Sequence, residues 1–197
     1  MGIETKKYQN YYAYMNHQKS KAPPGSPLFN KLIGENREPM LAGFRLNFAP
    51  HVDAIEKSTK ALCLGARTGA EVSVLKEMGL EDAIGIDLNP HPPLVVEGDI
   101  HYLQYEGSFF DFIFSNVFDH SCYPQKFISE IERVAKPNTY CILHLSINDR
   151  EDYHAANVLS DSQTAIDLFK RDVEILKNES LGQPDWPGYW ELVLRIL

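Results

Sequence analysis

The stretch Lys60–Gly69 reads KALCLGARTG, a short apolar run that ends in a turn bounded by two glycines. The apolar run predicts a buried strand. Helical periodicity over residues 70–78, stopped by Gly79, predicts a helix directly after the turn. A strand, a tight turn and a helix in this order form the first unit of a parallel α/β sheet.

The alternation of strand and helix continues along the chain. Further strands are predicted at residues 83–87, 94–97, 110–114, 140–145, 173–177 and 189–196, and helices at 125–135 and 162–170. This pattern is typical of a sheet of about seven mostly parallel strands with helices on both faces. The last two strands predict a hairpin-like antiparallel pair at one edge of that sheet.

The N-terminal part differs in composition from the rest of the sequence. Residues 6–15 contain four tyrosines, residues 21–27 are rich in Pro, Gly, Ser and Lys, and residues 39–57 repeat apolar side chains at helical spacing. We therefore expect a helical and loop extension at 1–58 and a main domain at 59–197. The tyrosine cluster is either a helix packed on the sheet, which we favour, or a lid over a substrate.

Charge and composition exclude several classes of protein. The 197 residues carry 19 Lys and Arg against 27 Asp and Glu, a net charge of −8, which disfavours nucleic-acid binding. No apolar run approaches the roughly 20 residues of a membrane helix, and the N-terminus has no signal-peptide character. Three scattered cysteines and seven histidines without metal-ligand spacing predict a cytoplasmic protein with reduced thiols and no metal.

Polar features follow four successive predicted strands, where each strand ends. They are the Gly65–Gly69 turn, Asp87, the pair Asp99 and Ile100, and the pair Ser115 and Asn116. The carboxyl ends of parallel strands meet at one edge of a sheet, where ligands bind. A carboxylate about 20 residues after such a turn suits the two hydroxyls of a ribose. The sequence therefore predicts a cofactor of the adenosine type.

Each feature also has a purely structural interpretation. Glycines at a strand–helix corner often serve geometry alone, and Asp87 is a candidate N-cap for a following helix. The dinucleotide pattern Gly-x-Gly-x-x-Gly is absent, because Arg67 stands where the middle glycine would be. A nicotinamide cofactor is therefore disfavoured. S-adenosylmethionine, which contains adenosine but no phosphate, fits this turn better.

The segments Ala61–Gly69, Gly85–Asp87, Glu97–Ile100 and Phe110–Asn116 resemble the successive motifs of class I S-adenosylmethionine-dependent methyltransferases, type 11-like. Within that class, the sequence is most similar to a poorly characterised methyltransferase-like subfamily. The resemblance covers about residues 60–146. It implies a Rossmann-like fold and S-adenosyl-L-methionine as the cofactor.

The resemblance also implies roles for single residues. The implied cofactor-binding residues are Gly65, Ala66, Arg67, Gly69, Asp87, Leu88, Asp99, Ile100, Ser115 and Asn116. Among them the turn lines the methionine portion, Asp87 holds the ribose, and Asp99 with Ile100 holds the adenine. Two positions depart from the family. Cys63 replaces a frequent acidic residue that orients the methionine amino group, and Arg67, in place of a small residue, reaches either the cofactor carboxylate or solvent.

Transfer of an activated methyl group requires alignment and exclusion of water rather than a covalent nucleophile. His120 is the candidate general base and Asp119 the group that orients it. In the alternative interpretation, Asp119 caps the next helix and His120 packs on the cofactor. A nucleophilic Cys122 is the weakest candidate.

The methyl acceptor is expected to be a small molecule or a peptide, and no oligomeric state is predicted. A catalytically silent cofactor-binding module that serves as a partner or scaffold subunit is the alternative function. We expect the N-terminal segment to cover the cleft at the strand end that carries Ser115 and Asn116. Aromatic side chains available as walls are Tyr8, Tyr11, Tyr12, Tyr14, Tyr153 and Trp186.

Overall fold

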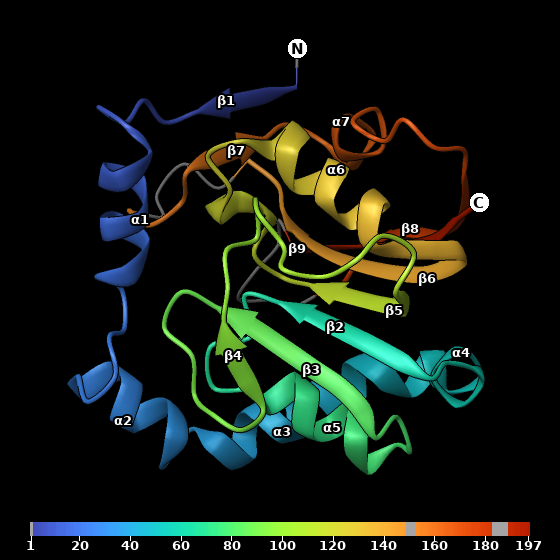
Figure 1. Cartoon of the computed structure of the whole chain (residues 1–197), viewed down its shortest axis with the longest axis horizontal. Helices are drawn as coiled ribbons and strands as arrows, with labels where there is room; N and C mark the ends of the chain where they lie inside the picture. The colour runs from blue at the N-terminus through green and yellow to red at the C-terminus, as the bar shows by residue number, and fades with distance from the viewer. Residues whose placement is uncertain (1, 149–152, 183–188) are drawn as a thin grey trace.

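The computed structural model describes residues 2–148, 153–182 and 189–197. At its centre lies a seven-stranded sheet in the order β4-β3-β2-β5-β6-β9-β8 (Figure 1). Its strands are β2 (Lys60–Leu64), β3 (Asp82–Asp87), β4 (Val95–Glu97), β5 (Phe110–Ser115), β6 (Ala135–Ser146), β8 (Val173–Ser180) and β9 (Tyr189–Ile196). Strands β2 to β6 are parallel, and β9 runs antiparallel to both β6 and β8. The predicted fold class is confirmed.

Helices cover both faces of the sheet. They are α2 (Pro27–Ile33), α3 (Arg37–Phe48), α4 (Val52–Lys57), α5 (Ala70–Glu77), α6 (Pro124–Val134) and α7 (Ser162–Ile166), with short 3₁₀ turns η1 (Ala49–His51) and η2 (Phe118–His120). In Figure 1, α6 and α7 lie above the sheet, and α3, α4 and α5 lie below it. None of the helices in the described ranges combines the length and the apolar composition of a membrane span.

Strand β2 shows how the sequence builds this core. Leu62 and Leu64 are buried in the cluster that contains the apolar face of α6. Ala61 and Cys63 are buried in the opposite cluster, which contains the apolar side chains of α5. Because side chains alternate between the two faces of a strand, a strand covered on both faces must be apolar at nearly every position.

The order of the strands creates a crevice. The chain runs outward from β2 to β3 and β4, and then returns to β5 on the other side of β2. In open parallel sheets, ligands bind outside the carboxyl ends of the strands at such a reversal. The predicted polar strand ends of β2 and β5 therefore flank this point.

The first part of the N-terminal extension, through helix α1 (Tyr11–Lys19), lies over these carboxyl ends, whereas α3 and α4 of the same extension pack on one face of the sheet with α5. Helix α1 stands beside the carboxyl end of β3 in Figure 1. The hydroxyl of Tyr14 donates to the backbone oxygen of His120 at 3.1 Å, and the Asn89 amide donates to the backbone oxygen of Lys19 at 2.7 Å. A two-stranded sheet of β1 (Ile3–Thr5) with β7 (Asn157–Leu159) fixes the chain before α1.

Three predicted boundaries are wrong by three residues or more. Helix α7 ends at Ile166 instead of residue 170, because the carboxylate of Glu132 accepts the backbone N–H groups of Lys170 and Arg171 at 2.7 and 2.6 Å. Strand β6 begins at Ala135 instead of residue 140, because Ala135 pairs with Phe110 of β5. Strand β8 extends to Ser180 instead of residue 177.

Candidate functional site

Two cavities lie at the crevice. The first is lined by Tyr14, Gln18, Lys21, Gly65, Arg67, Asp87, Leu88, Asn89, Gly98, Ile100, Val117 and His120. The second is lined by Leu32, Met40, Phe44, Gly65, Ala66, Arg67, Thr68, Glu71, Asn116, Val117 and His120. Because four lining residues are common to both, the cavities adjoin and form one groove, which we term the rim groove.

The turn after β2 is built from left-handed residues. Gly65, Arg67 and Gly69 have φ values of 75°, 40° and 72°. A Cβ on Gly65 would lie 2.5 Å from a methyl carbon of Val117, so glycine is required there for space as well as for conformation. Arg67 occupies a backbone conformation that non-glycine residues rarely adopt, a kind of strain that clusters at ligand sites.

Asp87 ends β3 and faces the first cavity. One carboxylate oxygen accepts the N–H of Arg67 at 3.1 Å, and the other accepts the N–H of Asn89 at 2.7 Å. Burial raises the pKa of Asp87, and these two hydrogen bonds oppose the rise. A carboxylate has about four acceptor positions, so both oxygens retain capacity for ribose hydroxyls. No helix follows Asp87 before β4, so the N-cap interpretation is wrong.

The carboxylate of Asp99 bonds helix α1 and its own loop. Its carboxylate accepts the hydroxyl of Tyr11 at 2.6 Å and the N–H of His101 at 2.9 Å. Burial raises the pKa of Asp99, but hydrogen bonds from His101 and Tyr11 outweigh it and lower the pKa. Gly98 and Ile100 line the first cavity and Asp99 is not among its lining residues. Its carboxylate is thus engaged by helix α1.

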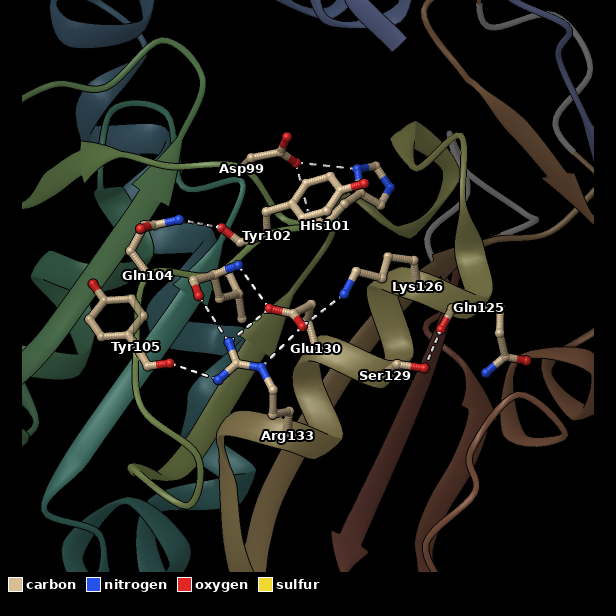
Figure 2. A network of polar contacts seen from close by, with 11 residues as sticks. Asp99, His101, Tyr102, Gln104, Tyr105, Gln125, Lys126, Ser129, Glu130 and Arg133 are labelled. Carbon is tan, nitrogen blue, oxygen red and sulfur yellow. Dashed lines mark hydrogen bonds and ion pairs between the residues drawn. The ribbon is translucent and has the colours of Figure 1, made fainter. Parts of the chain in front are cut away.

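Helix α6 fixes the loop that carries Asp99, as Figure 2 shows. Glu130 accepts the N–H of Leu103 at 2.8 Å, and the guanidinium of Arg133 donates to the backbone oxygens of Leu103 and Tyr105 at 2.9 and 2.7 Å. Arg133 and Glu130 are themselves paired at 2.8 Å, and Lys126 adds a second cation to Glu130. This network holds the first cavity's wall against the body of the domain.

Ser115 and Asn116 have different surroundings in the structure. Ser115 is fully buried, and its hydroxyl donates to the backbone oxygen of Leu64 and accepts the N–H of Val117, both at 3.3 Å. It lines neither cavity and shapes the end of β5. Asn116 lines the second cavity.

His120 lies where the two cavities meet. Its Nδ1 is 3.6 Å from Oδ2 of Asp119, and both residues belong to η2. The N-cap residue of α6 is Tyr123, so the interpretation of Asp119 as the cap of the next helix is wrong. Burial raises the pKa of Cys122 to about 12, which keeps the thiol protonated and disfavours it as a nucleophile.

Several lining residues were not singled out from the sequence. Gln18 and Lys21 belong to or follow α1, and Leu32, Met40 and Phe44 come from α2 and α3. Glu71 could have been recognised from the sequence, because it is an acidic residue within the apolar run that forms the buried part of α5. Of the six aromatic candidates, Tyr14 lines the groove, Tyr12 and Tyr153 are exposed, and Trp186 lies outside the described residues. Tyr11 bonds Asp99 and Tyr8 packs on Tyr14, and neither lines the groove. In the described ranges, no group of three His, Cys, Asp or Glu side chains is placed to hold a metal ion.

Comparison with known proteins agrees with this geometry. Residues 62–143 match the family model of a methyltransferase domain. No curated protein matches the sequence. A S-adenosylmethionine-dependent methyltransferase from Archaeoglobus fulgidus is similar in fold, with a TM-score of 0.61 and 15% identity over 85% of this chain and 98% of that one.

Two further structures have similar folds. One is a S-adenosylmethionine-dependent methyltransferase from Thermotoga maritima, with a TM-score of 0.58 and 13% identity over 86% of this chain and 98% of that one. The other comes from a Haloferax volcanii complex of the Trm112 methyltransferase activator with a protein described as a methyltransferase. Its TM-score is 0.56 at 13% identity, over 82% of this chain and 92% of that one. At these identities the similarity is one of fold.

Proposed function

Because residues 62–143 match a methyltransferase domain and the chain has the fold of class I S-adenosylmethionine-dependent methyltransferases, we propose that it transfers a methyl group from S-adenosylmethionine to a small-molecule or peptide acceptor. The observation that carries the proposal is the rim groove. A tight turn, the partly buried carboxylate of Asp87 and a glycine-containing loop line its first cavity, at the point where the strand order reverses.

We assign the adenosine of the cofactor to the first cavity. Asp87 accepts the ribose hydroxyls there, and the backbone of Ile100 faces the adenine edge. The methionine portion then passes Gly65 into the second cavity, where Arg67 is placed to meet its carboxylate. This assignment is supported by the lining residues that the two cavities have in common.

In the reaction, the protein positions the cofactor and the acceptor, shields them from water and deprotonates the acceptor. Helix α1 supplies Tyr14 and Gln18 as a cover over the first cavity, which limits access of water. The sulfonium supplies an activated methyl group. His120, at the junction of the cavities, accepts the proton of the acceptor, and the carboxylate of Asp119, 3.6 Å from its Nδ1, stabilises the positive charge that the ring acquires. Apolar side chains of α2 and α3 form the acceptor side of the second cavity.

A ligand panel followed by an activity assay tests the proposal. A ligand that binds only the folded protein raises its melting temperature, since stability increases by about RT ln(1 + [L]/Kd). We expect S-adenosylhomocysteine to raise it and NAD to leave it unchanged. Methyl transfer from radiolabelled cofactor is then measured over a library of amines, alcohols, thiols and peptides. A shift with NAD alone would contradict the proposal.

The alternative of a catalytically silent partner or scaffold subunit gives a different outcome. It predicts a shift with S-adenosylhomocysteine and no transfer to any member of the library. The similarity in fold to a structure from a complex between a methyltransferase and its activator supports this alternative. The cytoplasmic location stays a prediction.

A further inference from the structure

Glu71 is a buried carboxyl group at the second cavity. It lies in the first turn of α5, is 4% exposed and lines the cavity. Within the part of the chain that the structure describes, its carboxylate accepts a hydrogen bond from its own backbone N–H and meets no side-chain donor. A buried carboxylate is costly unless a cation or several donors accompany it.

Thr68 supplies an independent observation in the same cavity. Its side chain is fully buried, and its hydroxyl oxygen has no hydrogen-bond partner among the described residues. It precedes Gly69, the N-cap of α5, and Glu71 follows in the first turn. Buried polar atoms are nearly always paired, so a carboxyl group and a hydroxyl group without side-chain partners at one cavity indicate a polar ligand.

The guanidinium groups of Arg37 and Arg67 lie near Glu71 but do not compensate the cost of its burial. The guanidinium of Arg37 donates to the backbone oxygen of Thr68 at 3.2 Å and to the hydroxyl of Ser73 at 2.9 Å. The charges of Arg37 and Arg67 lower the pKa of Glu71, but burial outweighs them and raises it to about 8. The charged or titratable groups that act on Glu71 or feel its charge are Cys63 of β2, Asp87 of β3, Tyr189 of β9, Arg37 of α3 and Arg67 of the turn.

We propose that Glu71 and Thr68 form a binding subsite for a primary ammonium group in the second cavity. An ammonium has three N–H donors and no acceptor, and it favours the ionised carboxylate over the protonated acid, so it suits a carboxyl group and a hydroxyl whose residues line one cavity. The inference rests on the proposed function for the origin of that group. It is either the α-ammonium of the cofactor's methionine portion or the amine of a methyl acceptor.

Calorimetric titration distinguishes the two sources. The ligands are S-adenosylhomocysteine, its deaminated analogue, and 5′-methylthioadenosine, which lacks the amino acid portion. For the cofactor source, Glu71→Gln weakens S-adenosylhomocysteine at least tenfold and changes the other two less than twofold. Thr68→Val weakens it several-fold. Glu77→Gln is the matched control, because Glu77 lies on the same helix and is paired with Arg45 at the surface.

Proton release provides a readout that a purely structural role would not change. At pH 7 most Glu71 carboxyls are protonated in the free protein, and an ammonium ligand favours the ionised form. Titrations in two buffers of different ionisation enthalpy should show release approaching one proton per S-adenosylhomocysteine from the unmodified protein. The Glu71→Gln variant should release none.

The acceptor source is tested with n-butylamine added to protein saturated with S-adenosylhomocysteine. Binding of n-butylamine that is lost in Glu71→Gln, with unchanged affinity for S-adenosylhomocysteine, assigns the subsite to the acceptor. Equal affinities of the unmodified protein and both variants for every ligand would overturn the subsite and leave the proposed function intact. Absence of any nucleoside binding would overturn the proposed function. Titration of the unliganded protein and of both variants with n-butylamine would then still decide the subsite. If Glu71→Gln fails to fold, Thr68→Val carries the same comparison.

Discussion

The phenol of Tyr11 donates a 2.6 Å hydrogen bond to Oδ2 of Asp99 and thereby joins helix α1 to the loop after β4. The same hydroxyl lies 2.8 Å from Nδ1 of His101, whose Nε2 is 2.7 Å from the hydroxyl of Ser121. Burial and the Asp99 carboxylate both raise the pKa of Tyr11, which keeps the phenol a donor. The N-terminal extension is therefore fastened at the edge of the rim groove by a polar network.

The Tyr11→Phe variant tests this fastening. It removes a hydrogen bond to a charged, half-buried acceptor, so we expect a loss of about 1.5–3 kcal/mol in the free energy of unfolding, measured by urea titration. Tyr12→Phe is the control, because Tyr12 is 72% exposed and should change stability by less than about 0.5 kcal/mol. Equal effects of the two substitutions would show that the Tyr11 contact does not hold α1.

Asp87 is expected to determine affinity for the cofactor. Asp87→Ala should weaken S-adenosylhomocysteine at least roughly tenfold, the scale of a pair of charge-assisted hydrogen bonds. Because Asp87 also holds the N–H groups of Arg67 and Asn89, Asp87→Asn serves as a milder second variant. Asp82→Ala, at the exposed start of the same strand, should leave affinity unchanged. Unaltered binding in both Asp87 variants would mean that the ribose is held elsewhere.

The ends of the strands and their succession along the chain could be predicted from the sequence, because the apolar runs and the residues that end them are local patterns. The apolar run before Gly65 and the carboxylates after β3 and β4 lie within a few residues of the strands that position them. Parallel pairing then brings those ends to one edge. This is why the sequence alone could assign Gly65, Asp87 and Ile100 to one groove.

The remaining features depend on contacts between distant segments. Strand β1 has three residues and forms only because Asn157–Leu159 pairs with it. Asp99 bonds Tyr11, 88 positions away, and the end of α7 is set by Glu132. No local pattern encodes such partners. The acidic Glu71 in a buried helix was visible in the sequence, but its cavity depends on α2 and α3, whose placement was not predicted.

The Gly65→Ala substitution separates crowding from backbone strain. Gly65 and Gly79 both have positive φ, but an added Cβ would meet Val117 only at Gly65 and open space at Gly79. We expect Gly79→Ala to cost about 1–2 kcal/mol from conformation alone. Gly65→Ala should cost more and should also abolish detectable binding of S-adenosylhomocysteine. Indistinguishable unfolding curves for the two variants would contradict the close approach of Val117.

The buried Glu71 predicts a pH dependence of stability. Burial raises its pKa from 4.5 to about 8, so the folded protein holds an extra proton between these values. The stabilising contribution is complete below about pH 4.5 and is lost as the pH rises to about 8. Its slope is at most about 1.4 kcal/mol per pH unit. Urea titrations at pH 5, 6.5 and 8 should show this loss in the unmodified protein and a flatter dependence in Glu71→Gln; parallel dependences would contradict the raised pKa.

His120 is expected to act in catalysis rather than in binding. Once an acceptor is found, His120→Gln should lower kcat by about 10²–10⁴-fold and leave the affinity for S-adenosylhomocysteine within threefold. Asp119→Asn should have a smaller effect, since Asp119 acts only through its charge on the ring of His120. His91→Gln, in the loop before β4, is the control and should retain full activity. Full activity of the His120 variant would remove it as the base.

The most direct measurement is a crystal structure of the protein grown with S-adenosylhomocysteine. The account predicts density along the rim groove, with both ribose hydroxyls within hydrogen-bond distance of the Asp87 carboxylate and the homocysteine portion beyond Gly65. An empty groove at saturating ligand, or a ribose remote from Asp87, would contradict it.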